Sequence, residues 1–203
     1  MNQIIKNTII LFVITLVAGI CLGTVHDITL DPIAQAQEAA ATKTYQEVYP
    51  DAASFDEPQE LADAVTAAAD SISEWGFGKV TINDAKEALD ASGNQIGYLI
   101  TSTSAESYGG NVQIAVGITN EGELTGIGFL SISDTPGLGM RAKEPDFKDQ
   151  FIGKKAENLE VTKTGASADN QIEAISGATI TSKAVTNATD AAIYFVALSL
   201  IHI

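Results

Sequence analysis

The hydrophobic pattern divides the chain into three parts. Residues 8–25 contain no charged side chain and are predominantly apolar. This run is long enough for one membrane-spanning helix, because a bilayer core needs about 20 apolar residues in helical form. From residue 80 onward, short runs alternate apolar and polar residues or are rich in β-branched ones, as half-buried strands are. Residues 181–203 form one long helical candidate that becomes mostly apolar toward its end.

The strand pattern predicts an antiparallel sheet with flanking helices segregated from the strands, which is the α+β class. Turns that contain glycine separate the runs at residues 92–94 and 120–123 and are typical of β-hairpins. An Ala-rich helix over residues 62–75 precedes the sheet, and a short helical turn after Pro145 ends at Gly153. The predicted strands cover residues 80–83, 96–103, 112–119, 124–132, 159–164 and 172–175.

The segment after the apolar run predicts a stalk. Asp31 and Pro32 suit the N-cap and first position of a helix that continues the span into solvent, and a loop rich in Asp, Ser, Glu and Pro follows. We therefore expect a transmembrane anchor at residues 1–30, a stalk helix and linker at residues 31–60, and one globular domain at residues 61–203. A cleavable signal peptide is the alternative. Such peptides have a shorter apolar core and a small-residue cleavage site, and no such site follows the apolar run.

Charge is concentrated after the apolar run. The formal net charge is −15, and residues 27–203 hold all 26 acidic residues. A domain this acidic repels DNA, RNA and anionic lipid surfaces, which excludes nucleic-acid binding. Lys6 and the amino terminus precede the apolar run, whereas Asp27 and Asp31 follow it. Positive charge stays on the cytoplasmic side of a membrane, so we expect the domain on the extracytoplasmic face of the cell membrane.

The cysteine content limits the redox chemistry. Cys21 is the one cysteine of the chain, and it lies inside the apolar run. The domain beyond it has no thiolate for a zinc site or an iron–sulfur cluster, so electron transfer by this chain would need an organic cofactor. No acid–base pair, nucleophile–base pair or metal-ligand cluster stands out in the sequence.

The most informative stretch is residues 173–182, which read EAISGATITS. A short apolar strand is followed by a Ser-Gly-Ala-Thr turn and then a helix. Gly177 permits a tight turn and the close approach of another molecule. Thr179 lies at or just before the helix N-terminus, where free backbone N–H groups and the helix dipole favour a phosphate. An ordinary cap between a strand and a helix fits the same residues, so the local pattern alone leaves both interpretations open.

Residues 134–139 read DTPGLG and form a second candidate stretch. Pro136 presets the backbone for a turn, and Gly137 and Gly139 allow a flat ligand to approach the backbone. Leu138 supplies one apolar contact. A glycine-rich turn at the end of a strand is the simpler interpretation of the same residues.

A third stretch, residues 107–111, reads SYGGN and precedes a strand. It places Tyr108 in a turn, where the ring could contact a ligand or pack on the surface.

Together these stretches resemble the FMN-binding domain family. Ser-Gly-Ala-Thr with an acidic residue three positions before the Ser is similar to the flavinylation motif of that family. There a flavin transferase takes FMN from FAD and joins its phosphate to the final Thr as a phosphoester. The residue that matches this Thr is Thr179, so the resemblance implies covalent FMN at Thr179. The acidic position matches Glu173, where the family usually has Asp.

The other two stretches match the same family. Its Glu-Thr-Pro-Gly-Leu-Gly loop packs against the isoalloxazine ring, and the loop of this chain differs only at Asp134. The resemblance also places an aromatic residue of the third stretch near the flavin. It therefore implies cofactor contacts from Tyr108, Thr135, Gly137, Leu138, Gly139, Ser176, Gly177 and Ala178.

Within this family, the order and spacing of the stretches resemble the G subunit of Rnf complexes, which are ion-translocating ferredoxin:NAD oxidoreductases. This resemblance implies an electron-relay protein with membrane and iron–sulfur partner subunits, anchored in the bilayer by residues 8–25 and without substrate chemistry of its own. Three alternatives remain: the FMN-carrying C subunit of a sodium-pumping NADH:quinone reductase, a flavin-binding sensory or regulatory membrane module, and a flavin-free surface protein.

Overall fold

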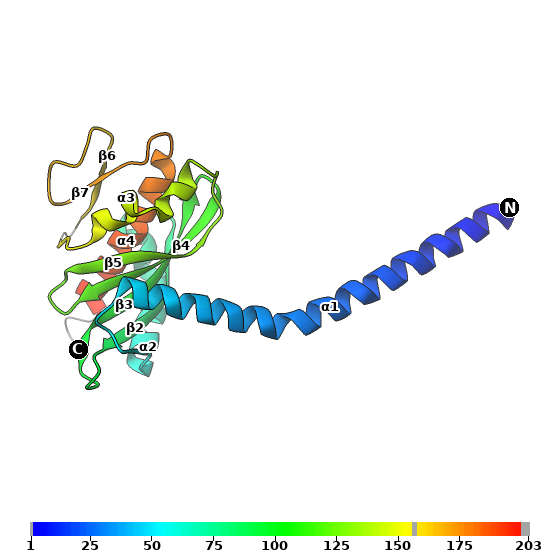
Figure 1. Cartoon of the computed structure of the whole chain (residues 1–203), viewed down its shortest axis with the longest axis horizontal. Helices are drawn as coiled ribbons and strands as arrows, with labels where there is room; N and C mark the ends of the chain where they lie inside the picture. The colour runs from blue at the N-terminus through cyan, green and yellow to red at the C-terminus, as the bar shows by residue number, and fades with distance from the viewer. Residues whose placement is uncertain (1, 156–157, 200–203) are drawn as a thin grey trace. The chain divides into compact units, whose positions relative to one another are not determined.

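The computed structural model describes residues 2–155 and 158–199 (Figure 1). The chain divides into two compact units, residues 1–42 and residues 43–203. The first helix, α1 (Asn2–Val48), supplies the whole described part of the first unit and ends in the second.

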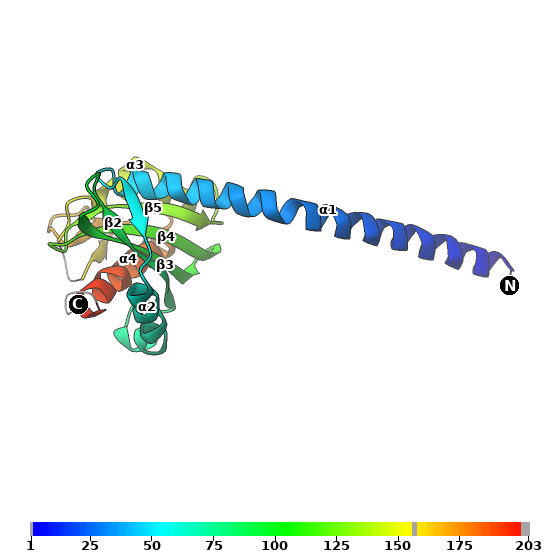
Figure 2. The ribbon, with the colours of Figure 1, turned by 90° about the horizontal axis from the view of Figure 1, so that it is seen from below.

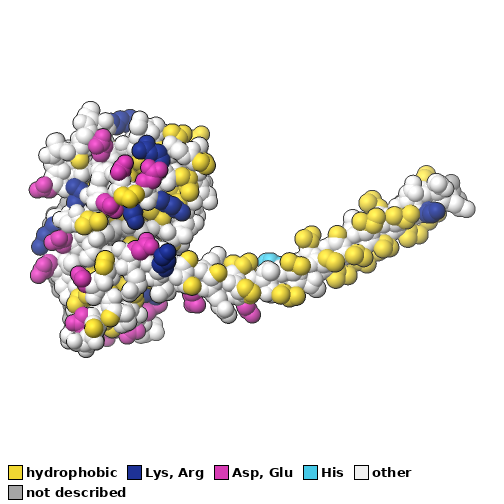
Figure 3. Space-filling model, in the orientation of Figure 1, with side chains coloured by type: hydrophobic (Ala, Val, Ile, Leu, Met, Phe, Trp, Pro, Cys, Tyr) yellow, Lys and Arg dark blue, Asp and Glu magenta, His cyan; other side chains and the backbone are white. Residues whose placement is uncertain are grey.

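The N-terminal part of α1 is long and apolar enough to cross a membrane, and its most apolar stretch contains no buried residue. Figure 3 shows hydrophobic side chains covering this part of the helix. The expectation that a new helix begins at Asp31 and Pro32 is wrong, because Pro32 lies inside α1. The good helix formers that follow Pro32, mainly Ala, Gln and Glu, continue the helix past the one N–H group that proline removes.

The second unit is built on a five-stranded antiparallel sheet in the order β1-β2-β3-β4-β5. The α+β class is confirmed. The strand β1 was not predicted, because its three residues carry too short a pattern to indicate a strand. The strands of this sheet are β1 (Ser54–Asp56), β2 (Val80–Leu89), β3 (Gln95–Ser107), β4 (Gly110–Thr119) and β5 (Leu124–Ile132).

Of the remaining elements, α2 and η1 lie between β1 and β2 in the chain, and the others follow β5. Two short strands, β6 and β7, form a separate parallel pair. The final helix begins at Thr179, two residues before the predicted start at Thr181. The elements are α2 (Gln59–Ser71), η1 (Ile72–Trp75), η2 (Gly139–Lys143), α3 (Pro145–Lys148), η3 (Asp149–Phe151), β6 (Glu160–Thr162), β7 (Gln171–Glu173) and α4 (Thr179–Ser199).

The main core lies between one face of the sheet and the helices α2 and α4. Figures 1 and 2 show α4 packed along that face. Ile100 of β3 and Ile114 of β4 are completely buried, as is Phe195 of α4. Small residues let α4 approach the strands closely, and Ala184, Ala188, Ala191 and Ala192 are all buried. The long, well-packed α4 thus fixes the position of its own first turn, which holds Thr179.

The other face of the sheet is covered by the end of α1. Tyr45 and Val48 pack with Leu99 of β3, and the Val48 carbonyl accepts a hydrogen bond of 2.7 Å from the Thr125 hydroxyl. The hydroxyl of Tyr49, which is 2 % exposed, donates to the Ile96 carbonyl at 2.7 Å. Residues 43–60 therefore belong to the folded unit, whereas the sequence predicted a stalk helix and linker over residues 31–60. The apolar residues at the end of α1 recur on one helical face and require a partner.

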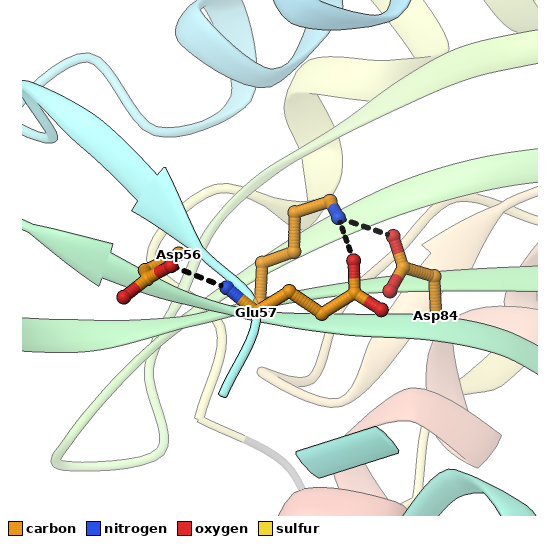
Figure 4. A network of polar contacts seen from close by, with 4 residues as sticks. Asp56, Glu57 and Asp84 are labelled. Carbon is orange, nitrogen blue, oxygen red and sulfur yellow. Dashed lines mark hydrogen bonds and ion pairs between the residues drawn. The ribbon is translucent and has the colours of Figure 1, made fainter. Parts of the chain in front are cut away.

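A small ionic network fixes the edge strand β1 to β2 (Figure 4). The Lys86 ammonium lies 2.7 Å from a Glu57 carboxylate oxygen and 2.8 Å from one of Asp84. The Glu57 backbone N–H donates to the Asp56 carboxylate at 3.0 Å. Burial alone would lower the pKa of Lys86, but its hydrogen bonds to Asp84 and Glu57 raise it above its ordinary value. The side chains of Lys86, Glu57 and Asp84 thus hold the residue that follows β1 against β2.

Candidate functional site

Three segments that are distant in sequence meet at one cavity of about 560 Å³. They are the turn after β3, the loop after β5 and the first turn of α4. The volume falls within the range of small-molecule sites in proteins, about 300–1,000 Å³. The lining residues are Tyr108, Asp134, Thr135, Leu138, Gly139, Gly177, Ala178, Thr179, Ile180 and Thr181.

Most of the residues that the sequence indicated as cofactor contacts or as part of the flavinylation motif line this cavity. Three do not. Gly137 lies beside Leu138 in the loop without lining the cavity, while Ser176 and Glu173 line a neighbouring one. The structure therefore brings the three candidate stretches together and divides the Glu173–Thr179 stretch between two cavities.

Thr179 is the first residue of α4 and is half-buried. The first hydrogen bond of the helix runs from the Ser182 N–H to the Ala178 carbonyl at 3.0 Å. The N–H groups of Thr179, Ile180 and Thr181 precede that bond and have no acceptor among the described residues. Within the same residues, the Thr179 hydroxyl makes no hydrogen bond. An unengaged hydroxyl and free N–H groups therefore lie together at the positive end of a helix dipole.

The turn before α4 requires glycine at Gly177. Its φ angle is +78°, a conformation that residues with a side chain rarely adopt. A Cβ atom at this position would lie 3.1 Å from a terminal methyl of Leu138. The turn and the glycine-rich loop thus approach each other directly at the cavity.

Apolar side chains are exposed around the cavity. Tyr108 is 74 % exposed, Ile180 55 % and Leu138 42 %. Single exposed apolar residues are common on protein surfaces, but a group of them around one cavity marks a binding site for an apolar surface.

The Asp134 carboxylate joins the three segments. One of its oxygens accepts hydrogen bonds from the Thr181 hydroxyl at 2.6 Å and the Ser107 hydroxyl at 2.9 Å. The other accepts from the Thr135 backbone N–H at 2.7 Å. Burial raises the pKa of Asp134, but hydrogen bonds from Thr181, Thr135, Ser107 and Gly109 outweigh it and bring the pKa below its ordinary value. A side chain at Gly139 would overlap this carboxylate, which explains the glycine.

The neighbouring cavity has a volume of about 270 Å³ and a more polar wall. Gln150 holds the backbone at Glu173 on this side: its amide oxygen accepts from the Glu173 N–H at 2.7 Å, and its amide nitrogen donates to the Glu173 carbonyl at 3.3 Å. Arg141 forms an ion pair of 3.2 Å with Glu144. The lining residues are Arg141, Glu144, Asp146, Phe147, Gln150, Glu173, Ala174, Ile175 and Ser176.

Sequence reasoning missed several contributors to these cavities. In the larger cavity, Asp134 was recognised as part of the loop but given no role, and Ile180 and Thr181 were not singled out. In the neighbouring cavity, Gln150 was not singled out. The only available signal for Asp134 was its place in the matched loop. In the described residues, no group of three or more His, Cys, Asp and Glu side chains is placed to hold a metal ion.

The larger cavity suits FMN in two respects. Leu138 and Tyr108 offer exposed apolar surface to a flat ring. The free N–H groups at the start of α4 suit a phosphate. Residues 107–194 match the family model of the FMN-binding domain, a range that contains every residue lining the cavity. By this match, the part of the folded unit that forms the cavity is of the FMN-binding domain class.

The chain also resembles particular proteins over nearly its whole length. Residues 1–48 match the family model of the RnfG N-terminal region. The G subunit of the Na⁺-translocating ferredoxin:NAD⁺ oxidoreductase complex of Acetobacterium woodii is 35% identical, over 94% of this chain and 90% of that protein. The G subunit of the proton-translocating complex of Clostridium ljungdahlii is 30% identical, over 95% and 91%. The chain therefore belongs to the family of G subunits of ion-translocating ferredoxin:NAD⁺ oxidoreductase complexes.

A solved structure shows a partial likeness. The C subunit of the Na⁺-translocating NADH-quinone reductase from Parabacteroides distasonis is 26% identical, with a TM-score of 0.45. The match covers 55% of this chain and 62% of that chain.

Proposed function

We propose that this chain is a membrane-anchored electron-transfer subunit that carries FMN covalently bound to Thr179 through a phosphoester. One observation carries the proposal: the Thr179 hydroxyl, free among the described residues, lies at a helix start on the wall of a cavity of about 560 Å³ that the glycine-rich loop and Tyr108 complete. Membership of the G-subunit family supports it.

Each part of the cavity has a role in this proposal. The N–H groups at the start of α4 hold the phosphate, and Leu138 and Tyr108 pack against the ring. Gly177 keeps the turn narrow beside Leu138. When bound, FMN supplies the reversible uptake and release of electrons. The chain contributes binding and orientation, and we assign it no separate substrate reaction.

The partners follow from the relatives. Both of the relatives described above are subunits of ferredoxin:NAD⁺ oxidoreductase complexes. We propose that this chain likewise relays electrons between membrane and iron–sulfur subunits, and that a flavin transferase loads it. The names of these relatives specify Na⁺ in one case and protons in the other, so family membership does not identify the translocated ion.

We further propose that α1 crosses the cell membrane once, with its amino terminus inside and the FMN-binding domain on the extracytoplasmic face. Lys6 before the apolar run and Asp27 after it support this orientation.

The attachment is tested in a host that possesses the transferase. The wild-type chain should fluoresce on a denaturing gel under ultraviolet light, and its intact mass should include one FMN less one water. Thr179→Ala should lose both signals, because the acceptor oxygen is gone. Thr179→Ser should keep them, and so should the control Thr66→Ala, which removes an exposed hydroxyl of α2 that does not line the cavity. Full fluorescence from Thr179→Ala would refute Thr179 as the attachment site.

A further inference from the structure

Among the described residues, the wall of the larger cavity carries a negative charge and no compensating cation. Among the residues that line it, Asp134 is the one with a charged side chain. Arg141 follows the loop but lines the neighbouring cavity, where it pairs with Glu144. Lys183, one turn after Thr179, is exposed and does not line the cavity.

This charge is held in place from three sides. The Thr181 hydroxyl reaches the carboxylate from α4, the Ser107 hydroxyl from the end of β3, and the Thr135 N–H from the loop itself. Asp134 is only partly exposed, so water screens its charge less than it screens a charge on the open surface. A fixed negative charge in such a place opposes the addition of electrons to any group bound in the cavity.

We propose that the Asp134 carboxylate lowers the reduction potential of the flavin bound in this cavity. The inference rests on the proposed function. Asp134 is a positioning residue, because it acts through its charge and transfers neither electrons nor a proton. The electrons of the reduction come from a redox partner of the complex. The hydrogen bonds that the carboxylate accepts from Thr181 and Ser107 compensate part of its negative charge, so removing either donor should strengthen its electrostatic effect on the flavin.

The experiment is a redox titration of the full-length, flavin-loaded protein in detergent, followed by its absorbance. Asp134→Asn removes the charge and keeps an oxygen that can accept from Thr181 or Ser107, so its potential should shift in the positive direction. Thr181→Val and Ser107→Ala keep the charge but remove one donor each, so their potentials should shift in the negative direction. Lys183→Gln removes an exposed charge and should shift the potential less than Asp134→Asn does.

The signs of these shifts separate an electrostatic role from a structural one. A merely structural carboxylate would give Asp134→Asn and Thr181→Val shifts of the same sign, and that result would overturn the inference. An unchanged or more negative potential in Asp134→Asn would also overturn it. If Asp134→Asn does not fold or load, the two donor variants decide the matter: negative shifts support the inference, and null or positive shifts overturn it.

Gel fluorescence, recorded before each titration, distinguishes the two proposals. If the variants carry flavin but their reduction potentials do not shift as expected, the role of Asp134 is refuted. The proposed attachment at Thr179 is then unaffected. A wild-type chain that carries no flavin in a host with the transferase refutes the proposed function itself. The unfolding temperatures of the flavin-free variants, measured in parallel, show how much each substitution weakens the fold.

Discussion

At Gly177, two constraints act on one residue. The φ angle of +78° disfavours any side chain, and a Cβ atom would press against Leu138 at 3.1 Å. Gly93 has a similar φ angle of +80°, but no atom lies within 4 Å of the position of its Cβ. Comparing alanine substitutions at Gly177 and Gly93 therefore separates the effect of backbone strain from the effect of crowding at the cavity.

We expect Gly177→Ala to lower the yield of flavin-loaded protein, because the new methyl group displaces Leu138 from the cavity. Gly93→Ala should carry a similar strain, of about 1–2 kcal/mol, without affecting loading. Thermal unfolding measures the strain, and the ratio of flavin fluorescence to protein on a denaturing gel measures the loading. Equal loading in the two variants would show that the contact with Leu138 is unimportant.

Residue roles were predictable only where the sequence carries a local motif. Gly177, Leu138 and Thr179 lie in short matched stretches, and the structure brings all three to one cavity. The contacts of Asp134 were not predictable, because Ser107 and Thr181 are 27 and 47 residues away from it in the chain. Hydrogen bonds between such distant side chains leave no periodic signal in a sequence.

On the scale of elements, α4 combines the proposed flavin attachment site with a buried acid. Asp190 is 4 % exposed and accepts a hydrogen bond of 2.9 Å from the Leu159 N–H, just before β6. Burial raises its pKa to about 7, and the Leu159 N–H opposes the shift only in part. The carboxyl group therefore binds its proton more tightly in the folded chain than in the unfolded chain, where the pKa is near 3.8.

The consequence is a pH-dependent stability. Between about pH 4 and pH 7 the folded state binds more protons than the unfolded state, so the free energy of unfolding should fall as the pH rises. Asp190→Asn removes this dependence and keeps an acceptor for Leu159. At pH 8 it should be more stable than the wild type by a few kcal/mol, given about 1.4 kcal/mol per pKa unit.

Denaturant unfolding at pH 5 and pH 8 measures this difference. Asp169→Asn, at an exposed position, is the control and should follow the wild type at both values. If Asp190→Asn and the wild type lose stability in parallel, Asp190 is not the group responsible.

The sequence predicted whether a segment is a helix or a strand wherever its pattern of apolar and polar residues was long. The strands β3 to β5 and the helix α4 have such patterns, and each was expected close to where it lies. For β2 only residues 80–83 were predicted, whereas the strand continues to Leu89. The short β1 was missed because it depends on its partner: Phe55 lies opposite Ala88 in the sheet, and the Lys86 network holds the residue after the strand. The continuity of α1 through Pro32 was missed because proline usually begins or ends a helix.

On the scale of the whole molecule, the sequence indicated an anchor and one domain but misplaced the boundary. The compact second unit begins at Lys43, because Tyr45, Val48 and Tyr49 bury their side chains in it. Hydrophobic residues near the end of a long helix do not reveal what they pack against, so the distinction between stalk and domain required the folded structure.

The orientation of the chain in the membrane is open to a labelling test. Replacing Cys21 with alanine removes the one native thiol, after which single cysteines can be placed on either side of the apolar run. Ala91→Cys lies at an exposed turn of the domain, and Gln3→Cys lies near the amino terminus. A membrane-impermeant maleimide should label the first variant in intact spheroplasts and the second only after lysis. The reverse pattern would place the FMN-binding domain in the cytoplasm.

The division of the larger cavity among three segments has a consequence for biogenesis. Its wall uses residues from Tyr108 to Thr181, so a nascent chain has no complete seat for the isoalloxazine ring until α4 has been synthesised and packed on the sheet. If the proposed function is right, the flavin can bind in the complete cavity only after the domain has folded, late in biogenesis. A flavin bound there therefore indicates a folded domain. The absorbance spectrum of the flavin bound in the cavity would then show that the domain has matured, without any added tag.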